Sequence, residues 1–172
     1  MRRKYERKVP TKGYNDRVRI NYDRKQPTFE YMKYFRVVRY WVKRTHGVGL
    51  ADLEMMMFLH SERLFTKTKF AEFEEIMTWD VTRFERLKRE GWINIWRKGK
   101  KAEATLYELS FKGKALVNTV YKKLSGEQPI AETAGNNPIF KKNPPYTDKV
   151  YKRAIVKMNN ETKEQRQRLA PE

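Results

Sequence analysis

The chain has 172 residues, of which 39% are hydrophobic and 35% charged, a length that favours one compact domain with appendages. It has no cysteine and two histidines, which excludes disulfide scaffolds, zinc fingers, thiol catalysis and multi-histidine metal sites. Lys and Arg number 39 against 21 Asp and Glu, and the resulting net charge of +18 predicts a polyanionic partner.

Nucleic acid and an anionic membrane surface are the two polyanions that suit this charge. No apolar run approaches the roughly 18–20 residues of a membrane helix, and the basic start leads into no apolar signal segment. The basic residues do not gather on one amphipathic helix, as lipid binding would require. The sequence therefore predicts a cytoplasmic protein without a membrane partner, associated with the nucleoid or with viral DNA.

The charge excess lies mainly at the N-terminal end. Lys and Arg exceed Asp and Glu by 11 over residues 1–44, by 3 over residues 45–130 and by 4 over residues 131–172. Residues 1–27 mix basic, aromatic, Pro and Gly residues without a period, which predicts an arm that is flexible in isolation and follows a DNA groove. A merely solubilising tail is the alternative. The candidate DNA contacts of the arm are Arg2, Arg3 and Lys4.

The first two predicted helices cover residues 28–46 and 50–61. Thr28 is the expected N-cap of the first helix, which ends near Gly47. Its aromatic stripe exceeds what a small domain needs for its own core, so we expect part of it to contact a second chain, with closure of one larger core as the alternative. Helical spacing predicts the inward face of the second helix. That face consists of Leu50, Leu53, Met56, Met57 and His60.

The next two helices form a helix-turn-helix unit. The first spans residues 66–77, with Thr66 or Thr68 as cap and Phe70, Phe73 and Ile76 inward. After a break at Thr78, the second runs over residues 79–90 and ends at Gly91. Its predicted inward residues are Val81, Phe84 and Leu87.

The period then changes to that of a β-hairpin. Residues 92–96 and 105–109 are rich in β-branched and aromatic side chains, and a basic, glycine-containing tip separates them. Ser110 caps a helix over 111–124, followed by a linker over 127–146. A last helix starts after Thr147 with a polar tail to residue 172. The inward residues expected on the helix after the hairpin are Leu116, Val117, Val120, Tyr121 and Leu124; those on the last helix are Val150, Tyr151, Ala154, Ile155 and Met158.

This order of elements over residues 28–158 resembles the MarR family of winged-helix transcription regulators. The stretch from Arg83 to Ile93 looks like the end of the family's recognition helix, and Tyr107 to Leu116 is similar to its L-T-x-x-G-x-x-L stretch. The resemblance implies a mainly α fold with a small β-hairpin wing (α+β), in which residues 28–126 form a winged helix-turn-helix domain. It also implies a homodimer through residues 28–43, 111–124 and 147–158. The family's Asp-x-Arg element is missing from the wing, and the basic arm and the linker are additional.

In a helix-turn-helix the second helix enters the major groove, so the resemblance makes residues 79–90 the recognition helix. Arg83 and Arg86 are expected to point outward and to bind guanine as bidentate forks, with a solvated face paired to Asp80 and Glu90 as the alternative. The start of the preceding helix suits a phosphate, and the wing tip suits the adjacent backbone or minor groove, with protection of the sheet edge as its alternative. The candidate DNA contacts are Thr66, Lys67, Thr68, Lys69, Asp80, Thr82, Arg83, Arg86, Arg97, Lys98, Lys100 and Lys101.

No pattern for catalysis, a cofactor or a metal is found in the sequence. Asp52 with Glu54, and the run Glu72, Glu74 and Glu75, alternate with core residues on helices, which favours solvated faces over a magnesium site. We therefore expect no enzyme, no cofactor and no metal, but a sequence-specific double-stranded DNA-binding protein that regulates transcription; nothing in the sequence identifies an effector. The alternative is an architectural or virion-associated component that binds DNA or protein without operator specificity.

Overall fold

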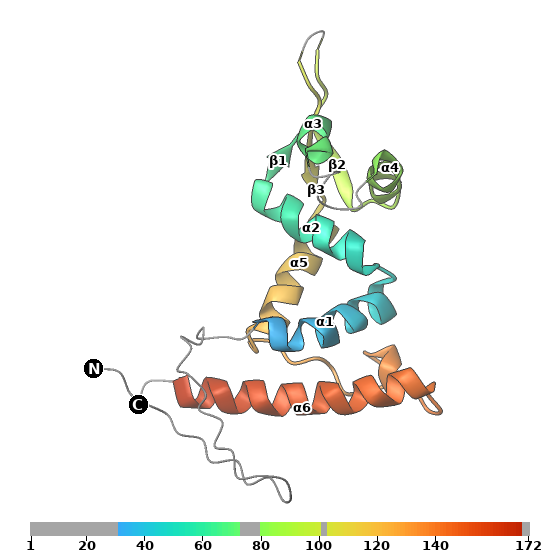
Figure 1. Cartoon of the computed structure of the whole chain (residues 1–172), viewed down its shortest axis with the longest axis vertical. Helices are drawn as coiled ribbons and strands as arrows, with labels where there is room; N and C mark the ends of the chain where they lie inside the picture. The colour runs from blue at the N-terminus through green and yellow to red at the C-terminus, as the bar shows by residue number, and fades with distance from the viewer. Residues whose placement is uncertain (1–30, 73–79, 101–102, 170–172) are drawn as a thin grey trace, which may run out of the picture. The chain divides into compact units, whose positions relative to one another are not determined.

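Helices make up most of the structure, and a small antiparallel sheet adjoins them (Figure 1). The computed structural model describes residues 31–72, 80–100 and 103–169, and residues 31–172 form one compact unit. The mainly helical α+β class predicted from the sequence is thereby confirmed. The elements are α1 (Tyr31–His46), α2 (Leu50–Glu62), β1 (Leu64–Phe65), α3 (Lys67–Ala71), α4 (Val81–Arg89), β2 (Ile93–Arg97), β3 (Leu106–Leu109), α5 (Phe111–Leu124), the 3-10 helix η1 (Pro138–Phe140) and α6 (Tyr146–Leu169).

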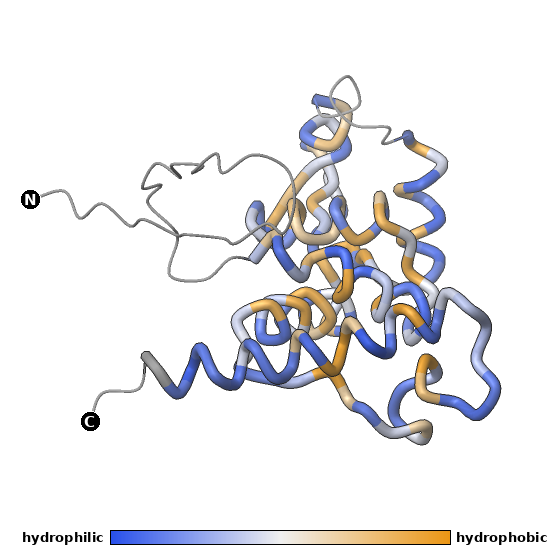
Figure 2. The backbone as a smooth tube through the Cα atoms, turned by 60° about the horizontal axis from the view of Figure 1, so that its bottom comes forward, coloured by the Kyte–Doolittle hydropathy of each residue, from blue (hydrophilic) through white to orange (hydrophobic). Residues whose placement is uncertain are grey.

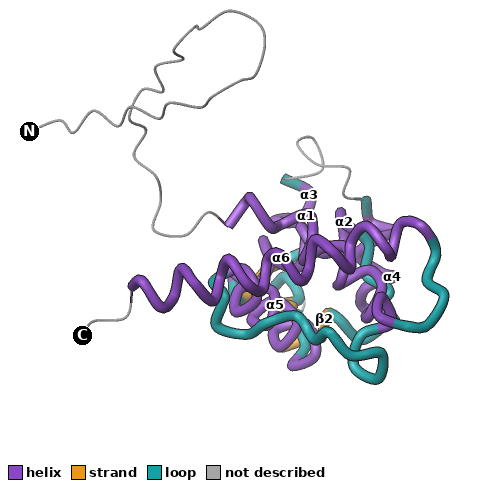
Figure 3. Tube along the Cα trace, turned by 90° about the horizontal axis from the view of Figure 1, so that it is seen from below, coloured by secondary structure: helices purple, strands orange, loops and turns teal. Residues whose placement is uncertain are grey.

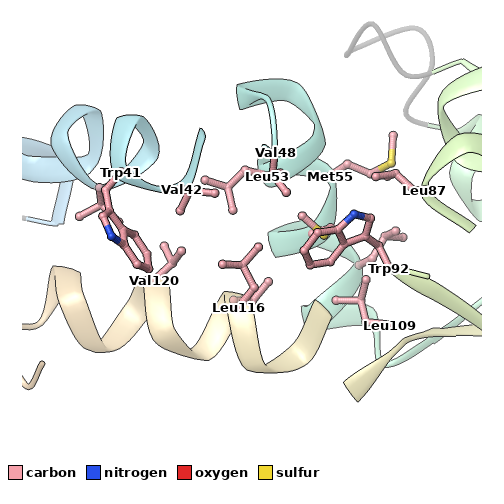
Figure 4. Close-up of a cluster of buried hydrophobic side chains, with 14 of the residues drawn as sticks. Trp41, Val42, Val48, Leu53, Met55, Leu87, Trp92, Leu109, Leu116 and Val120 are labelled. Atoms are coloured by element: carbon pink, nitrogen blue, oxygen red, sulfur yellow. The ribbon is translucent and has the colours of Figure 1, made fainter. Parts of the chain in front are cut away.

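Helix α5 is the element around which the core is built. It packs against α1, α2 and β3. Figure 4 shows Trp41 and Val42 of α1 facing Leu116 and Val120 of α5, and all four side chains are buried. The hydrophobic stretches run through the interior of the unit, whereas the C-terminal part of α6 is hydrophilic (Figure 2).

The sheet contains one strand that the sequence analysis did not predict. Its strand order is β1-β3-β2, and both pairings are antiparallel. The unpredicted strand β1 has two residues, of which Phe65 is opposite Tyr107. Strand β2 is therefore an edge strand, and its pairing with β3 is interrupted by a bulge between Ile95 and Arg97. The bulge makes Trp96 the additional residue of β2.

Most predicted helix ends agree with the structure. Gly47 and Gly91 end α1 and α4 with positive φ angles of 70° and 76°, a conformation that favours glycine. The side chains of Thr66 and Ser110 accept hydrogen bonds from backbone N–H groups in the first turns of α3 and α5, as N-caps do. The predicted cap at Thr28 and the predicted features at Phe73, Ile76 and Thr78 lie outside the described residues.

Four of the predicted helix faces were partly wrong. Val81 and Tyr121 are exposed to 58% and 44%, because Val81 begins α4 beyond the sheet and Tyr121 lies at the outer side of α5. Val150 of α6 is also exposed. In α2 the buried face is rotated from the predicted one, so that Leu50 is exposed. The buried residues of α2 are Asp52, Leu53, Met55, Met56 and Leu59.

Helix α6 covers the far side of α1 and extends to Leu169, through the stretch predicted as a polar tail. The buried carboxylate of Asp148 accepts hydrogen bonds from the Tyr40 hydroxyl and from the Arg44 guanidinium, the latter at 2.8 Å. Burial and the bond to Asp148 raise the pKa of Tyr40 to about 12. The ring of Tyr40 also stacks on Tyr151, with the ring centroids 3.7 Å apart. The aromatic stripe predicted on α1 is also partly covered within the same chain, since its Trp41 is buried where α1 packs against α5.

Residues 127–146, expected as a linker, run along α6 and contribute to the core (Figure 3). Ile130 and Ile139 are buried. The side-chain amide of Asn159 in α6 accepts a hydrogen bond from the N–H of Ile130 and donates one to the carbonyl of Ile130. No helix in the described parts of the chain has the length and hydrophobicity to cross a membrane.

The hairpin, α4 and α5 meet at the backbone of Trp92. Its N–H donates to the carbonyl of Leu87 at the end of α4, and its own carbonyl accepts from the N–H of Ser110, both at 2.9 Å. A Cβ atom on Gly113 would lie 2.9 Å from that carbonyl oxygen. The position requires glycine because of this close approach.

We expect Gly113→Ala to lower the free energy of unfolding by about 1–2 kcal/mol, although alanine is the better helix former, because the added methyl group meets the Trp92 carbonyl. Urea unfolding followed by circular dichroism measures the change. Gly135→Ala is the matched control, since a Cβ at Gly135 meets no atom within 4 Å and its φ is not positive. Equal unfolding midpoints for the two variants would contradict the close approach.

Candidate nucleic-acid interface

Helix α4 begins at an acidic cap. The Asp80 carboxylate accepts a hydrogen bond of 2.6 Å from the backbone N–H of Arg83. This bond satisfies one of the free N–H groups that every helix start presents. Asp80 therefore has a structural role in the described geometry, and only its second oxygen would remain for a cytosine amine.

The two arginines expected to bind guanine are paired with an acid of α2. Arg86 Nη2 lies 2.6 Å from Asp52 Oδ1, and Arg83 Nε lies 3.3 Å from the same oxygen. The Arg83 side chain is 24% exposed, so the prediction that it points outward was wrong. The ion pairs with Asp52 were not among those of the paired alternative, which named Asp80 and Glu90. Both guanidinium groups lie against Asp52 because this carboxylate is buried and needs compensating charge.

The outward side of α4 has a mixed charge. Thr82 and Arg89 are exposed, and within the described residues no carboxylate lies within ion-pair distance of Arg89. Glu85 lies between Lys67 of α3 at 2.5 Å and Lys88 at 3.5 Å. The hydrogen bond between Lys67 and Glu85 is the main cause that raises the pKa of the lysine and lowers that of the carboxyl group.

The start of α3, predicted to bind phosphate, is also occupied by its own contacts. The Thr66 hydroxyl oxygen caps the helix by accepting from the Lys69 N–H at 3.2 Å. Lys67 is paired with Glu85, and Lys69 lies 3.2 Å from Glu72. Thr68 is exposed. Carboxylates of the same chain thus partly neutralise the cations of α3, and a phosphate would have to compete with them.

The hairpin retains the most accessible positive charge. Lys98 and Lys100 are exposed, and within the described residues no carboxylate lies within ion-pair distance of either. Arg97 lies 3.7 Å from Glu103, both being largely exposed. A Cβ atom on Gly99 would lie 2.0 Å from the carbonyl oxygen of Glu103 on the other side of the hairpin, so this close approach requires glycine. Figure 1 shows the hairpin extending away from α1 and α6.

Several predicted contacts lie outside the described residues. These are Arg2, Arg3, Lys4 and Lys101. The structure therefore brings together Arg97, Lys98 and Lys100 on the hairpin, and separately Arg83 and Arg86 at Asp52.

Two features of the site were missed by the sequence analysis. Asp52 was taken as part of a solvated face, although it recurs with Met55, Met56 and Leu59 at helical core spacing. An acid in such a pattern signals a buried charge with a cationic partner. Trp96 was assigned to a strand without regard to its exposure, and its bulge has no simple sequence signal.

Metal ligation has no support in the described part of the chain, where no group of three or more His, Asp or Glu residues could hold an ion. The candidate interface consists of the cations on the hairpin and on α4. Comparison with known proteins gives no relative: no family model, no curated protein and no solved structure matches the chain.

Proposed function

We propose that this protein binds double-stranded DNA through α4 and the basic hairpin, as a winged helix-turn-helix protein similar to MarR regulators. The observation that carries the proposal is the hairpin itself. It extends from the sheet with Lys98 and Lys100 exposed and unpaired within the described residues, where phosphates can reach them. The net charge of +18 supports the same partner.

The arrangement of the elements around the hairpin also supports the proposal. Helices α3 and α4 precede the hairpin, and α4 packs against β2, as the resemblance to winged helices implies. The strand order β1-β3-β2 places β2 at the edge beside α4. A duplex lying along α4 would therefore meet the hairpin on the adjacent backbone or minor groove, with Thr82 and Arg89 directed toward the major groove.

The homodimer implied by the resemblance is part of the proposal. Its support is the apolar surface that remains after α1, α5 and α6 have packed in one chain. Tyr31 and Met32 at the start of α1 and Tyr121 of α5 are exposed to 45%, 79% and 44%. Exposed apolar side chains on two helices favour an interface in which a second copy of the chain buries them.

A second candidate function, binding to any DNA sequence as an architectural component, is favoured by the pairing at Asp52. Arg83 and Arg86 are the side chains best suited to guanine, and both are held by the same carboxylate. Selection from random duplex DNA with the full chain distinguishes the two functions. A regulator enriches one near-palindromic site with a specificity ratio of about 10³ or more, whereas an architectural protein enriches none.

We expect the double substitution Lys98→Gln with Lys100→Gln to weaken duplex binding on the order of tenfold at 100 mM salt and to reduce the salt slope by about two units, because two phosphate contacts are lost. Fluorescence anisotropy with a labelled duplex over a series of salt concentrations measures both quantities. The control is Lys141→Gln with Lys142→Gln, which removes the same charge from exposed residues after η1. Equal effects of the two pairs would show that net charge alone attracts DNA and would overturn the role of the hairpin.

We expect Asp52→Asn to strengthen duplex binding by about threefold or more, because each released guanidinium can form charge-assisted contacts worth about 1.5–3 kcal/mol. The same anisotropy assay measures the change, and urea unfolding checks that the fold persists. Glu54→Gln, on the same helix, is the control: it removes an equal charge, and no arginine of the described residues lies within ion-pair distance of Glu54. If both variants gain affinity equally, Arg83 and Arg86 do not contact DNA.

A further inference from the structure

Trp96 is placed in a way that its own fold does not explain. It is the additional residue at the bulge of β2, the edge strand of the sheet. A bulge turns a side chain out of the regular alternation of a strand. The Trp96 side chain is 52% exposed, whereas Trp41 and Trp92 are buried. Adjoining apolar side chains left in water mark a site of contact, and Trp96 adjoins Ile95, which is also exposed.

The surroundings of Trp96 are cationic. The guanidinium carbon of Arg97 lies 5.9 Å from the centroid of the Trp96 ring, in a cation–π arrangement. Lys98 follows in the sequence and is exposed, and the neighbouring Ile95 is also 40% exposed. A partner for this surface must therefore offer a flat apolar face and a negative charge a few ångströms away. A nucleotide has both, in its base and its phosphate.

An intact duplex offers such a face only at its ends, because neighbouring base pairs cover each other. An aromatic side chain stacks on a base where the strand is single or where a base step is opened. We propose that Trp96 stacks on an unpaired or unstacked DNA base, while Arg97 and Lys98 bind the flanking phosphates. This inference rests on the proposed function and adds to it: the hairpin prefers DNA in which a base beside the duplex is accessible.

The experiment compares three DNA probes bound by the full chain. The first probe is a blunt duplex. The second is the same duplex with a single-stranded flank of ten thymidines, and the third carries a flank of ten abasic sites with the same phosphates. The wild-type protein should bind the thymidine flank at least about fivefold more tightly than the abasic flank, as expected from the stacking of one base. Trp96→Leu should abolish this preference, and Trp96→Phe should retain most of it.

The outcomes separate this inference from the proposed function. If the wild type binds the blunt duplex but does not distinguish the two flanks, or if Trp96→Leu keeps the preference, the stacking role is overturned and duplex binding persists. If the wild type binds none of the probes at low salt, the proposed function fails and the inference fails with it. Lys98→Gln should weaken binding to both flanks by the same factor, since it removes a phosphate contact only. Circular dichroism verifies that each variant is folded. Because Trp96 is exposed, we expect its substitutions to leave the fold unchanged.

Discussion

The hydrogen bonds at the backbone of Trp92 determine how the elements of the candidate interface are held together. Three residues, 90–92, connect α4 to β2, and the carbonyl of Trp92 accepts from the N–H of Ser110, where β3 passes into α5. The ammonium group of Lys112 lies 3.7 Å from the centroid of the Trp92 indole and covers its outer side. Since Gly113 approaches the same carbonyl, α5 cannot move away without loss of these contacts. The hairpin is thereby oriented by the helix that also organises the core.

The electrostatics of the unit differ from what its net charge alone suggests. Of the cations on α3 and α4, Lys67, Arg83 and Arg86 each have an acid within 3.3 Å. These acids belong to the domain itself, and the two groups at Asp52 are partly withdrawn from solvent. Exposed ion pairs of this kind stabilise the fold by little, so their main effect is on which cations are available to a ligand. The available ones are Lys98 and Lys100 on the hairpin and Arg89 at the end of α4.

Local signals in the sequence were sufficient for most of the fold. Glycines at helix ends and hydroxyls at helix starts predicted boundaries at Gly47, Gly91 and Ser110, because these residues act within their own turn. Strand β1 was missed because two residues cannot show a period, and it exists only through its pairing with β3.

The candidate site was harder to predict than the fold, since its chemistry depends on contacts between elements. The hairpin cations were predictable because a basic tip between two strands has no core to enter. The pairing of Arg83 and Arg86 with Asp52 joins residues more than 30 positions apart, and helical spacing on α4 alone cannot reveal it. The buried carboxylate of Asp52 on α2 determines where the two arginine side chains lie.

The tryptophans of the described residues differ in environment, and this gives the protein built-in optical probes. Trp41 lies in the core beneath the buried ammonium group of Lys123, at 4.6 Å from the ring centroid, and burial lowers the pKa of that lysine. Trp92 is buried at the junction of the hairpin, whereas Trp96 faces water. Emission from the buried indoles reports the integrity of the interior, and the quenchable, red-shifted emission of Trp96 reports the state of the hairpin. Once Trp79, which lies outside the described residues, is replaced by phenylalanine, one spectrum can follow the interior and the hairpin separately.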